Sequence, residues 1–180
     1  MSPSRKDMIE HSRKIVLFGR LLFGLLITMP PAVSHAGEFP IADLVVIEKA
    51  ARKLHLLQNG KAFRTFTIAL GLRPVGDKKK EGDFKTPEGR YWLDARNQNS
   101  DFFLAIHVSY PNENDRREAR ELGADAGGAI MIHGQPNVPT RSETYYRTQD
   151  WTNGCIAVSN SDMIDIWLMT GENTPIEIRP

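Results

Sequence analysis

The alternation of apolar and polar positions predicts a chain that is mostly β-structure. Apolar, β-branched or alternating runs indicate strands at residues 44–48, 53–58, 61–70, 89–93, 102–108, 129–133, 154–158 and 175–179. Asn59 and Gly60 separate the second run from the third, and both central residues of a type I′ hairpin turn need a positive φ. We therefore expect a hairpin there, with Phe66, Ile68 and Leu70 on one face of the sheet.

Two segments have the end signals of helices. Residues 114–122 begin with a capping Asn and end at Gly123, and residues 162–170 follow polar residues and end at Gly171. The second segment carries enough apolar side chains to dock on a sheet. The predicted fold class is mainly β (α+β), with one or two helices packed outside the sheet.

A long segment rich in glycine and proline, residues 71–89, separates the hairpin from the next predicted strand. Its composition excludes regular structure, so we expect an ordered loop or a mobile flap. Within it, Lys78, Lys79 and Lys80 form a basic run. Such runs are usually solvated loop tips, and the alternative is that this one lines a cleft for an anionic substrate.

The first 36 residues have the pattern of a secretory leader. Basic residues precede a short apolar run at 21–29, and Ser34 and Ala36 are the small residues that a signal peptidase reads before cleaving ahead of Gly37. A membrane anchor is the alternative, but a longer apolar run would include Arg20, and a spanning helix needs about 20 mostly apolar residues. We predict a cleaved signal peptide at 1–36, which contacts the membrane only during export, and one domain at 37–180.

Removal of the leader changes the charge balance. It takes away five of the 23 basic and two of the 22 acidic residues, which leaves a formal charge of −2. This balance gives no electrostatic footprint for nucleic acid. A domain of this length buries most of its apolar surface without disulfides, so stability does not explain the single cysteine, Cys155.

Cys155 is the first candidate for chemistry. A free thiol is a liability in an oxidising compartment, so a retained one is more often reactive than structural, although a buried and inert cysteine remains an alternative. It follows Gly154, which lets the backbone approach a substrate closely and lets nearby amides point at an oxyanion.

A cysteine nucleophile needs a base, and the predicted domain offers His55, His107 and His133. His55 lies within a hairpin strand, where a half-exposed histidine is the simpler interpretation. His133 closes an apolar strand and precedes a glycine, which suits either a catalytic residue or a hydrogen-bonded strand end; His107 has a similar but weaker context. A zinc site made by His107, His133 and Cys155 is a further alternative, without the close paired spacing of zinc motifs.

The combination of His133-Gly134 with Thr152-Asn153-Gly154-Cys155-Ile156 resembles the signature of L,D-transpeptidases of the YkuD type. The stretches GLRPVGDKKKEGDFKTPEGRYWL, LAIHVSYPN, GAIMIHGQPN and TPIEIRP are similar to the subgroup named murein transpeptidases. The resemblance covers residues 43–180. It implies an L,D-transpeptidase-like β-sandwich or barrel that acts on the tetrapeptide stems of peptidoglycan, in the periplasm, without a metal or organic cofactor.

The resemblance also implies residue roles. Cys155 would attack the carbonyl of an L-centred diamino acid and release the terminal D-alanine, and His133 would take and return the proton. Backbone amides near Gly154 and Cys155 would hold the oxyanion, a carbonyl near Gly134 would orient the imidazole, and Thr152 and Asn153 belong to the same element. The acyl group would pass to an amine of another stem, to a lysine of a wall-attached protein, or to water.

Two positions depart from the family pattern. Asn153 stands where relatives carry histidine, and Ala157 stands where they often carry Arg or Asn. Both departures bear on the choice of acceptor and on the balance between transfer and hydrolysis. A hydrolase that cuts stems or releases wall proteins is therefore one alternative function. A non-catalytic wall-binding module is another. Arg141 and Arg147 lie in the loop after Gly134, and together with His107 they are the predicted substrate-binding residues. The alternative for this segment is a plain surface loop.

Overall fold

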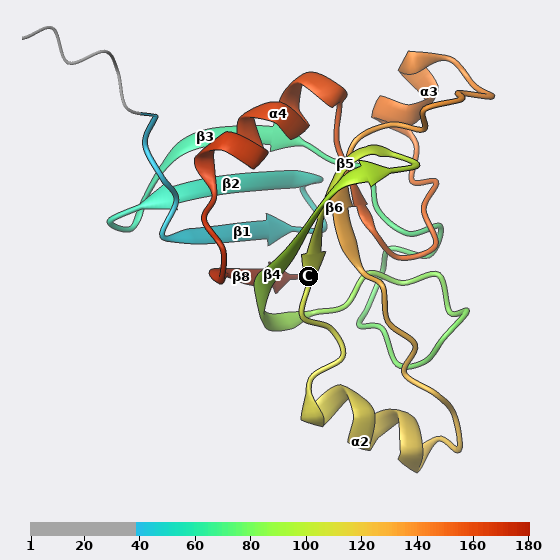
Figure 1. Cartoon of the computed structure of the whole chain (residues 1–180). Helices are drawn as coiled ribbons and strands as arrows, with labels where there is room; N and C mark the ends of the chain where they lie inside the picture. Colours follow the sequence, from blue (N-terminus) through green and yellow to red (C-terminus); the bar gives the residue numbers. More distant parts are fainter. Residues whose placement is uncertain (1–38) are drawn as a thin grey trace, which may run out of the picture. The chain divides into compact units, whose positions relative to one another are not determined.

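The computed structural model describes residues 39–180 and shows one curled sheet with three helices around it (Figure 1). The predicted signal peptide, residues 1–36, lies outside the described residues. Among the described helices, none combines the length and the apolar character that a membrane span requires. The strands are β1 Leu44–Glu48, β2 Lys53–Gln58, β3 Lys61–Thr67, β4 Gly89–Ser100, β5 Phe103–Val108, β6 Met131–His133, β7 Ile156–Ala157 and β8 Thr174–Arg179.

The eight strands form a single sheet in the order β3-β2-β1-β8-β4-β5-β6-β7. The β2–β3 hairpin turns at Asn59 and Gly60, whose φ values are 52° and 75°, as the Asn-Gly signal predicts. The last strand, β8, pairs with β1 in parallel and with β4 in antiparallel orientation, so it joins the two halves of the sheet. The sheet is therefore assembled from sequence-distant strands, and β4 is long enough to pair with both β8 and β5.

The two outer edges of the sheet meet through the segment that follows β3. Ala69 exchanges backbone hydrogen bonds of 2.8 Å with Ala157 of β7, and the Thr152 amide donates to the Leu70 carbonyl at 3.1 Å. These contacts give the sheet a barrel-like closure, which agrees with the predicted β-sandwich or barrel. They also fix the chain on both sides of Cys155.

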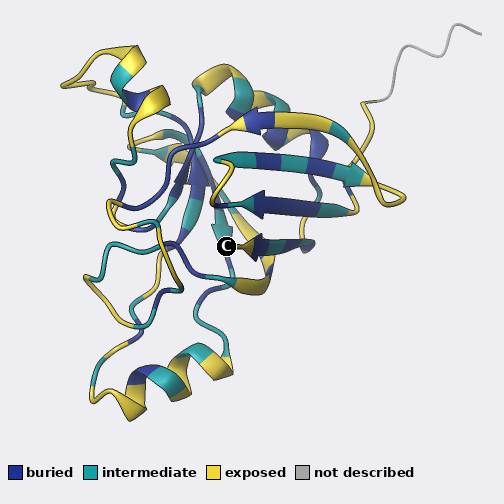
Figure 2. Ribbon diagram, turned by 180° about the vertical axis from the view of Figure 1, so that it is seen from behind, coloured by how far each residue is buried: buried dark blue, intermediate teal, exposed yellow. Residues whose placement is uncertain are grey.

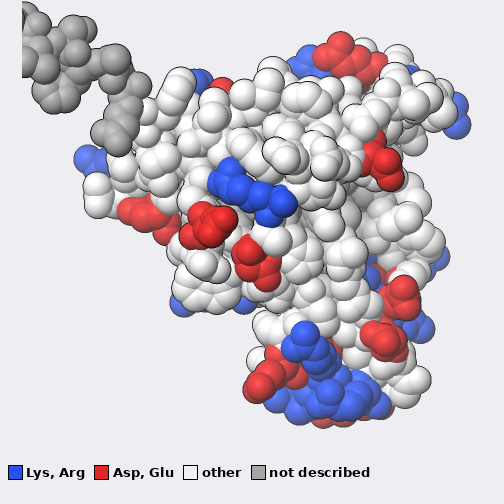
Figure 3. All heavy atoms as spheres, viewed as in Figure 1, with Lys and Arg blue, Asp and Glu red and all other residues white. Residues whose placement is uncertain are grey.

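The helices are α2 Glu113–Glu121, α3 Glu143–Thr148 and α4 Asn160–Met169. Helix α4 begins after the Ser159 cap and buries Met163, Ile166 and Met169 in the core. Helix α2 is capped by Asn112 through a capping box, two residues earlier than the predicted Asn114, and Lys and Arg side chains gather over it (Figure 3). Helix α3 is short and was not predicted; it forms because Ser142 caps residues expected to be loop.

The core lies between the sheet and α4 (Figure 2). Phe66, Ile68 and Leu70 are all buried, which confirms the predicted common face. In β5, Ile106 and Val108 are buried in this core, while Ala105 and His107 alternate onto the opposite face. In β4 a register shift between Leu93 and Ala95 places Asp94 beside Ala95, and both are exposed. The opposite face of β4, β5 and β6 is the one that carries His133.

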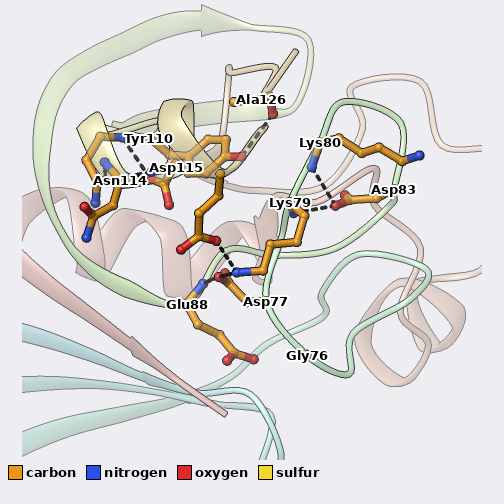
Figure 4. A network of polar contacts seen from close by, with 12 residues as sticks. Gly76, Asp77, Lys79, Lys80, Asp83, Glu88, Tyr110, Asn114, Asp115 and Ala126 are labelled. Atoms are coloured by element: carbon orange, nitrogen blue, oxygen red, sulfur yellow. Dashed lines mark hydrogen bonds and ion pairs between the residues drawn. The ribbon is translucent and has the colours of Figure 1, made fainter. Parts of the chain in front are cut away.

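The 71–88 loop, between β3 and β4, is an ordered structure held by charges. Lys49, whose side chain is 2% exposed, donates to the carbonyls of Gly76 and Thr86 and to Glu88 Oε1, all within 2.9 Å. Asp77 accepts from the Glu88 amide and pairs with Lys79, which also pairs with Glu118 of α2 (Figure 4). The loop is thereby tied both to the end of β1 and to α2.

The expectation of a solvated tip at the Lys78–Lys80 run is wrong for its first residue. Lys78 is 4% exposed and donates to Asp83 Oδ1 and to the Lys80 carbonyl, both at 2.9 Å. Asp83 also accepts from the backbone amides of Lys79 and Lys80 (Figure 4), and these donors hold the pKa of its carboxyl below the ordinary value although burial acts to raise it. Because Asp83 lies in the same turn as the lysine run, Lys78 can be buried together with its counter-ion.

Candidate active site

Cys155 lies in a tight turn between Trp151 and β7. Gly154 has a φ of +134°, and a Cβ on it would lie 2.6 Å from the Lys85 carbonyl oxygen and 3.3 Å from Ile130 Cδ1. The backbone therefore passes against the 71–88 loop with no space for a side chain. The glycine before the cysteine is required by this close approach.

Thr152 fixes the turn with its buried hydroxyl. Its Oγ1 accepts from the Gly154 amide at 3.1 Å and donates to the Cys155 carbonyl at 2.8 Å. The Gly154 amide is thus already used, so it is not free to hold an oxyanion as predicted. Within residues 39–180, no acceptor is paired with the Cys155 amide. That amide is the available donor beside the thiol.

His133 ends β6 and is 4% exposed. Its Nδ1 lies 2.7 Å from the carbonyl oxygen of Gly134, which can only accept, so Nδ1 carries the proton and Nε2 is the free basic nitrogen. Gly134 is packed so closely that a Cβ would lie 2.6 Å from Asn160 Oδ1. Burial lowers the pKa of His133 to about 4, against which the carbonyl of Gly134 acts weakly, so the imidazole is neutral near pH 7.

Two aromatic rings enclose the imidazole. The Phe102 ring centroid lies 4.7 Å and the Trp151 centroid 5.6 Å from that of His133. The Trp151 ring contacts Tyr146 of α3 in turn, and its Nε1 donates to the Tyr146 carbonyl. Neither ring was singled out from the sequence. Together they remove water from His133 and restrict its ring orientation.

Cys155 and His133 line the same cavity of about 490 Å³. Phe102, Trp151, Asn153 and Met131 also line it, and the polar end of β4 forms its rim. Cys155 and Asn153 also line a second cavity of about 400 Å³, whose other wall includes Lys78 and Phe84 of the 71–88 loop and the segment 127–130. Cys155 therefore lies between two cavities.

Burial raises the pKa of the Cys155 thiol above its ordinary value, while the Met131 amide and the charge of Lys78 act in the opposite direction. The Sγ–H group donates to the carbonyl of Ala129 at 3.4 Å. Since the pKa of His133 is lowered, both groups are neutral in the resting state at pH 7. The site therefore holds a neutral thiol and a neutral imidazole.

The remaining predicted site residues lie in several places. Asn153 is exposed and lines both cavities, whereas Ala157 is buried in β7. His107 is half-buried on the His133 face of the sheet and pairs with Asp94 at 2.6 Å. Arg141 stacks on Tyr145 and Arg147 lies on α3; neither is among the residues that line the Cys155 cavities.

The zinc alternative finds no support in the geometry. Over the described part of the chain, no three His, Cys, Asp or Glu side chains gather closely enough to hold a metal ion. His107 is engaged with Asp94, while His133 and Cys155 line one cavity together with Phe102 and Trp151.

Comparison with known proteins identifies the family of the chain. The family model for the YkuD L,D-transpeptidase catalytic domain matches residues 42–178, which is most of the chain. The chain belongs to this family. The protein named "Putative L,D-transpeptidase YafK" of Escherichia coli (strain K12) is 41% identical over 63 residues, covering 33% of this chain and 23% of YafK.

Solved structures show the same fold. The helical cell shape determining protein Pgp2 of Campylobacter jejuni matches with a TM-score of 0.58 at 29% identity, over 76% of this chain and 46% of that one. An L,D-transpeptidase from Mycobacterium smegmatis matches with a TM-score of 0.50 at 15% identity, over 76% of this chain and 58% of that one. The YkuD-family chain thus spans less than half the length of Pgp2 and about a quarter of YafK.

Proposed function

We propose that this YkuD-family chain is an exported cysteine acyltransferase that modifies the tetrapeptide stems of peptidoglycan. The observation that carries the proposal is the pairing of Cys155 and His133 on one cavity, with the His133 Nδ1–H group committed to the Gly134 carbonyl and Nε2 left as the base. The family match supports the reaction class.

In the first half-reaction, the Cys155 sulfur forms a bond to the carbonyl carbon of the diamino acid while His133 Nε2 takes the thiol proton. The oxyanion forms beside the Cys155 amide, and Thr152 keeps the turn that presents this amide. Collapse breaks the C–N bond to the terminal D-alanine, whose nitrogen receives the proton from His133. A thioester at Cys155 and free D-alanine result.

In the second half-reaction an amine attacks the carbonyl carbon of the thioester and His133 takes a proton from the amine. The C–S bond then breaks, and His133 returns the proton to the Cys155 sulfur. The amine belongs to another stem or to a lysine of a wall-attached protein, and water in its place makes the enzyme a hydrolase. Asn153 lines both cavities beside Cys155 and cannot be protonated, so it acts on the acceptor through hydrogen bonds alone. Export through the leader at 1–36 places the enzyme in the periplasm with its substrate.

The test is mass spectrometry of the protein of residues 37–180 after incubation with a tetrapeptide muropeptide. We expect a covalent adduct on Cys155 that lacks the mass of D-alanine, and no adduct in Cys155→Ala. His133→Gln should fold and form the adduct at least 100-fold more slowly, since general base catalysis contributes about 10²–10⁴. Binding to sacculi without any adduct would instead favour the wall-binding module.

The products then separate transfer from hydrolysis. With purified tetrapeptide muropeptides, a transferase yields cross-linked dimers and a hydrolase yields shortened monomers. Addition of a lysine-bearing peptide tests the protein acceptor in the same reaction. Asn153→His is the matched variant, because it restores the residue that relatives carry and leaves Cys155 and His133 in place.

A further inference from the structure

Lys78 is a buried cation on the wall of the second cavity, the one of about 400 Å³ that Cys155 also lines. Its side chain is 4% exposed, and its Nζ donates to Asp83 Oδ1 and to the Lys80 carbonyl, both at 2.9 Å. An ammonium group has three N–H donors, so one of them has no acceptor among the described residues. The two half-reactions at Cys155 give this cation no role.

The counter-ion of Lys78 is shared with other donors. Besides Lys78 Nζ, the Asp83 carboxylate accepts from the backbone amides of Lys79 and Lys80 (Figure 4). Burial raises the pKa of the Cys155 thiol and the charge of Lys78 acts against it, so the effect of this charge reaches the nucleophile. Lys78 therefore offers a donor and a positive charge to a group that binds beside Cys155.

Glu81 lines the same cavity and is exposed. Its amide donates to the Asp125 carbonyl at 2.8 Å, and a Cβ on Gly127 would lie 3.1 Å from Glu81 Cβ, so its backbone is packed against the other wall of the cavity. Over residues 39–180, the Glu81 carboxylate forms no ion pair, and Lys78 pairs with Asp83 instead. The cavity thus has a buried cation and an exposed anion that do not neutralise each other. This arrangement suits a ligand group that carries a carboxylate and an ammonium together.

The position of His133 indicates which part of the stem lies in the second cavity. His133 lines the first cavity and is not among the residues that line the second. In the proposed reaction it gives a proton to the leaving D-alanine and takes one from the incoming amine, so both groups must lie on the side of the first cavity. The diamino acid, which stays bonded to sulfur, is left for the second. Cys155, Ala129 and Asn153 line both cavities, so a group bonded to Sγ can extend from one into the other.

The diamino acid has the charges that this cavity requires. In a dicarboxylic diamino acid, the last carbon of the side chain carries both an amine and a carboxylate. The leaving D-alanine has a carboxylate as well, but its nitrogen is an uncharged amide. A side chain that enters the second cavity therefore satisfies Lys78 and Glu81 together, whereas D-alanine would satisfy Lys78 alone.

We propose that Lys78 is a specificity-determining residue that binds the carboxylate at the side-chain end of the diamino acid, in the second cavity beside Cys155. This inference rests on the proposed function and deepens it, because Lys78 then selects stems with a dicarboxylic diamino acid over stems with lysine at the same position. Lys78 acts on binding of the donor stem and takes no part in proton transfer.

The experiment compares three tetrapeptides: the unmodified one, one with the side-chain carboxylate of the diamino acid converted to an amide, and one with the terminal carboxylate of D-alanine converted to an amide. Calorimetry with Cys155→Ala measures binding without reaction. The side-chain amide should raise Kd about tenfold, as expected for loss of one charge-assisted hydrogen bond, and the terminal amide should change Kd less than about threefold.

Variants in the Cys155→Ala background assign this preference to Lys78. In Lys78→Met, the Kd of the unmodified tetrapeptide should rise to that of the side-chain amide, so that the two no longer differ. Lys78→Arg, which keeps the charge, should retain the preference. Lys80→Met is the matched control and should also retain it, because Lys80 is exposed in the same loop and contacts Lys78 and Asp83 through its backbone alone.

Two results would overturn the proposal. One is a Lys78→Met variant that still prefers the unmodified tetrapeptide tenfold over its side-chain amide. The other is a Kd that rises with the terminal amide and not with the side-chain amide, which would place D-alanine at Lys78. The ratio of the two Kd values within one variant does not depend on the fraction of folded protein, so a loss of stability in Lys78→Met leaves the test valid. If the wild type forms no acyl adduct, the proposed function fails, and binding to Cys155→Ala still tests Lys78.

Discussion

The Cys155 turn and the 71–88 loop are both irregular, and they touch each other, yet different forces hold them. Backbone amides and the hydroxyl of Thr152 hold the turn, and no charged side chain hydrogen-bonds within it. The loop is held by Lys49–Glu88, Lys78–Asp83 and Lys79–Asp77 pairs. The two meet where the Lys85 carbonyl faces Gly154.

Cys155 and His133 are both neutral near pH 7, although a strongly charged loop lies beside them. Burial is the largest cause of the pKa shifts of both Cys155 and His133, and the nearest loop charge, that of Lys78, is paired with Asp83. The loop can therefore be strongly charged without creating a thiolate–imidazolium pair in the resting enzyme. The charged 71–88 loop thus packs against a turn whose Cys155, like His133, is neutral.

The largest expected effect comes from the contact between the two regions. Gly154→Ala places a Cβ against the Lys85 carbonyl at a positive φ, so strain and overlap should lower the free energy of unfolding by about 4 kcal/mol and abolish acylation. Gly82→Ala is the matched control. Its φ is +71° but no atom lies within 4 Å of the new Cβ, so it should cost only about 1–2 kcal/mol and keep activity.

For both variants, urea unfolding gives the change in the free energy of unfolding, and mass spectrometry of the adduct gives the change in acylation. Equal losses in Gly154→Ala and Gly82→Ala would mean that backbone conformation alone matters and that the close packing of loop and turn does not.

The Lys49–Glu88 pair should give an asymmetric result. Glu88→Ala leaves a buried ammonium without its counter-charge, and we expect a loss of about 3 kcal/mol in the free energy of unfolding. Lys49→Met leaves Glu88, which is 20% exposed and can be hydrated, so about 1–2 kcal/mol is expected. Urea unfolding of both variants at pH 7 checks the order; a larger loss in Lys49→Met would contradict it.

The strands were predictable from the sequence, and its two candidate residues, Cys155 and His133, line one cavity, but the surroundings of these two residues were not predictable. Strand alternation is local, so β1, β2 and the Asn59-Gly60 turn were predictable. Which of the two expected amides, that of Gly154 or that of Cys155, is free was not predictable, because Gly154 donates its N–H to Thr152 only in the folded turn. Burial of Lys78 and the rings around His133 depends on segments far apart in the chain, and a charge run or an isolated Phe carries no signal of what covers it.

Alkylation of Cys155 by iodoacetamide reports the resting state of the thiol. Since burial raises the thiol pKa, the rate at pH 7 should be lower than that of a cysteine peptide and should still increase above pH 9, the ordinary value. The protein unfolded in urea should react at the peptide's rate. A plateau below pH 7 would show a preformed thiolate and remove the contrast between the neutral turn and the charged loop.

The smallest expected effect concerns the Phe102 ring, which shields the His133 imidazole from water. The rate of acylation at low substrate concentration should fall only as the pH drops through about 4, because His133 must lose its proton to act as base and burial keeps its pKa there instead of near 6.5. Phe102→Ala opens one face of the imidazole to water, so the acid limb should move to higher pH, while Phe102→Leu should keep it low. The activity of Phe102→Ala at pH 7 should stay within about threefold of the wild type, since Nε2 remains unprotonated there. An acid limb that stays at the same pH in Phe102→Ala would mean that burial by the sheet alone, without the aromatic wall, sets the basicity of His133.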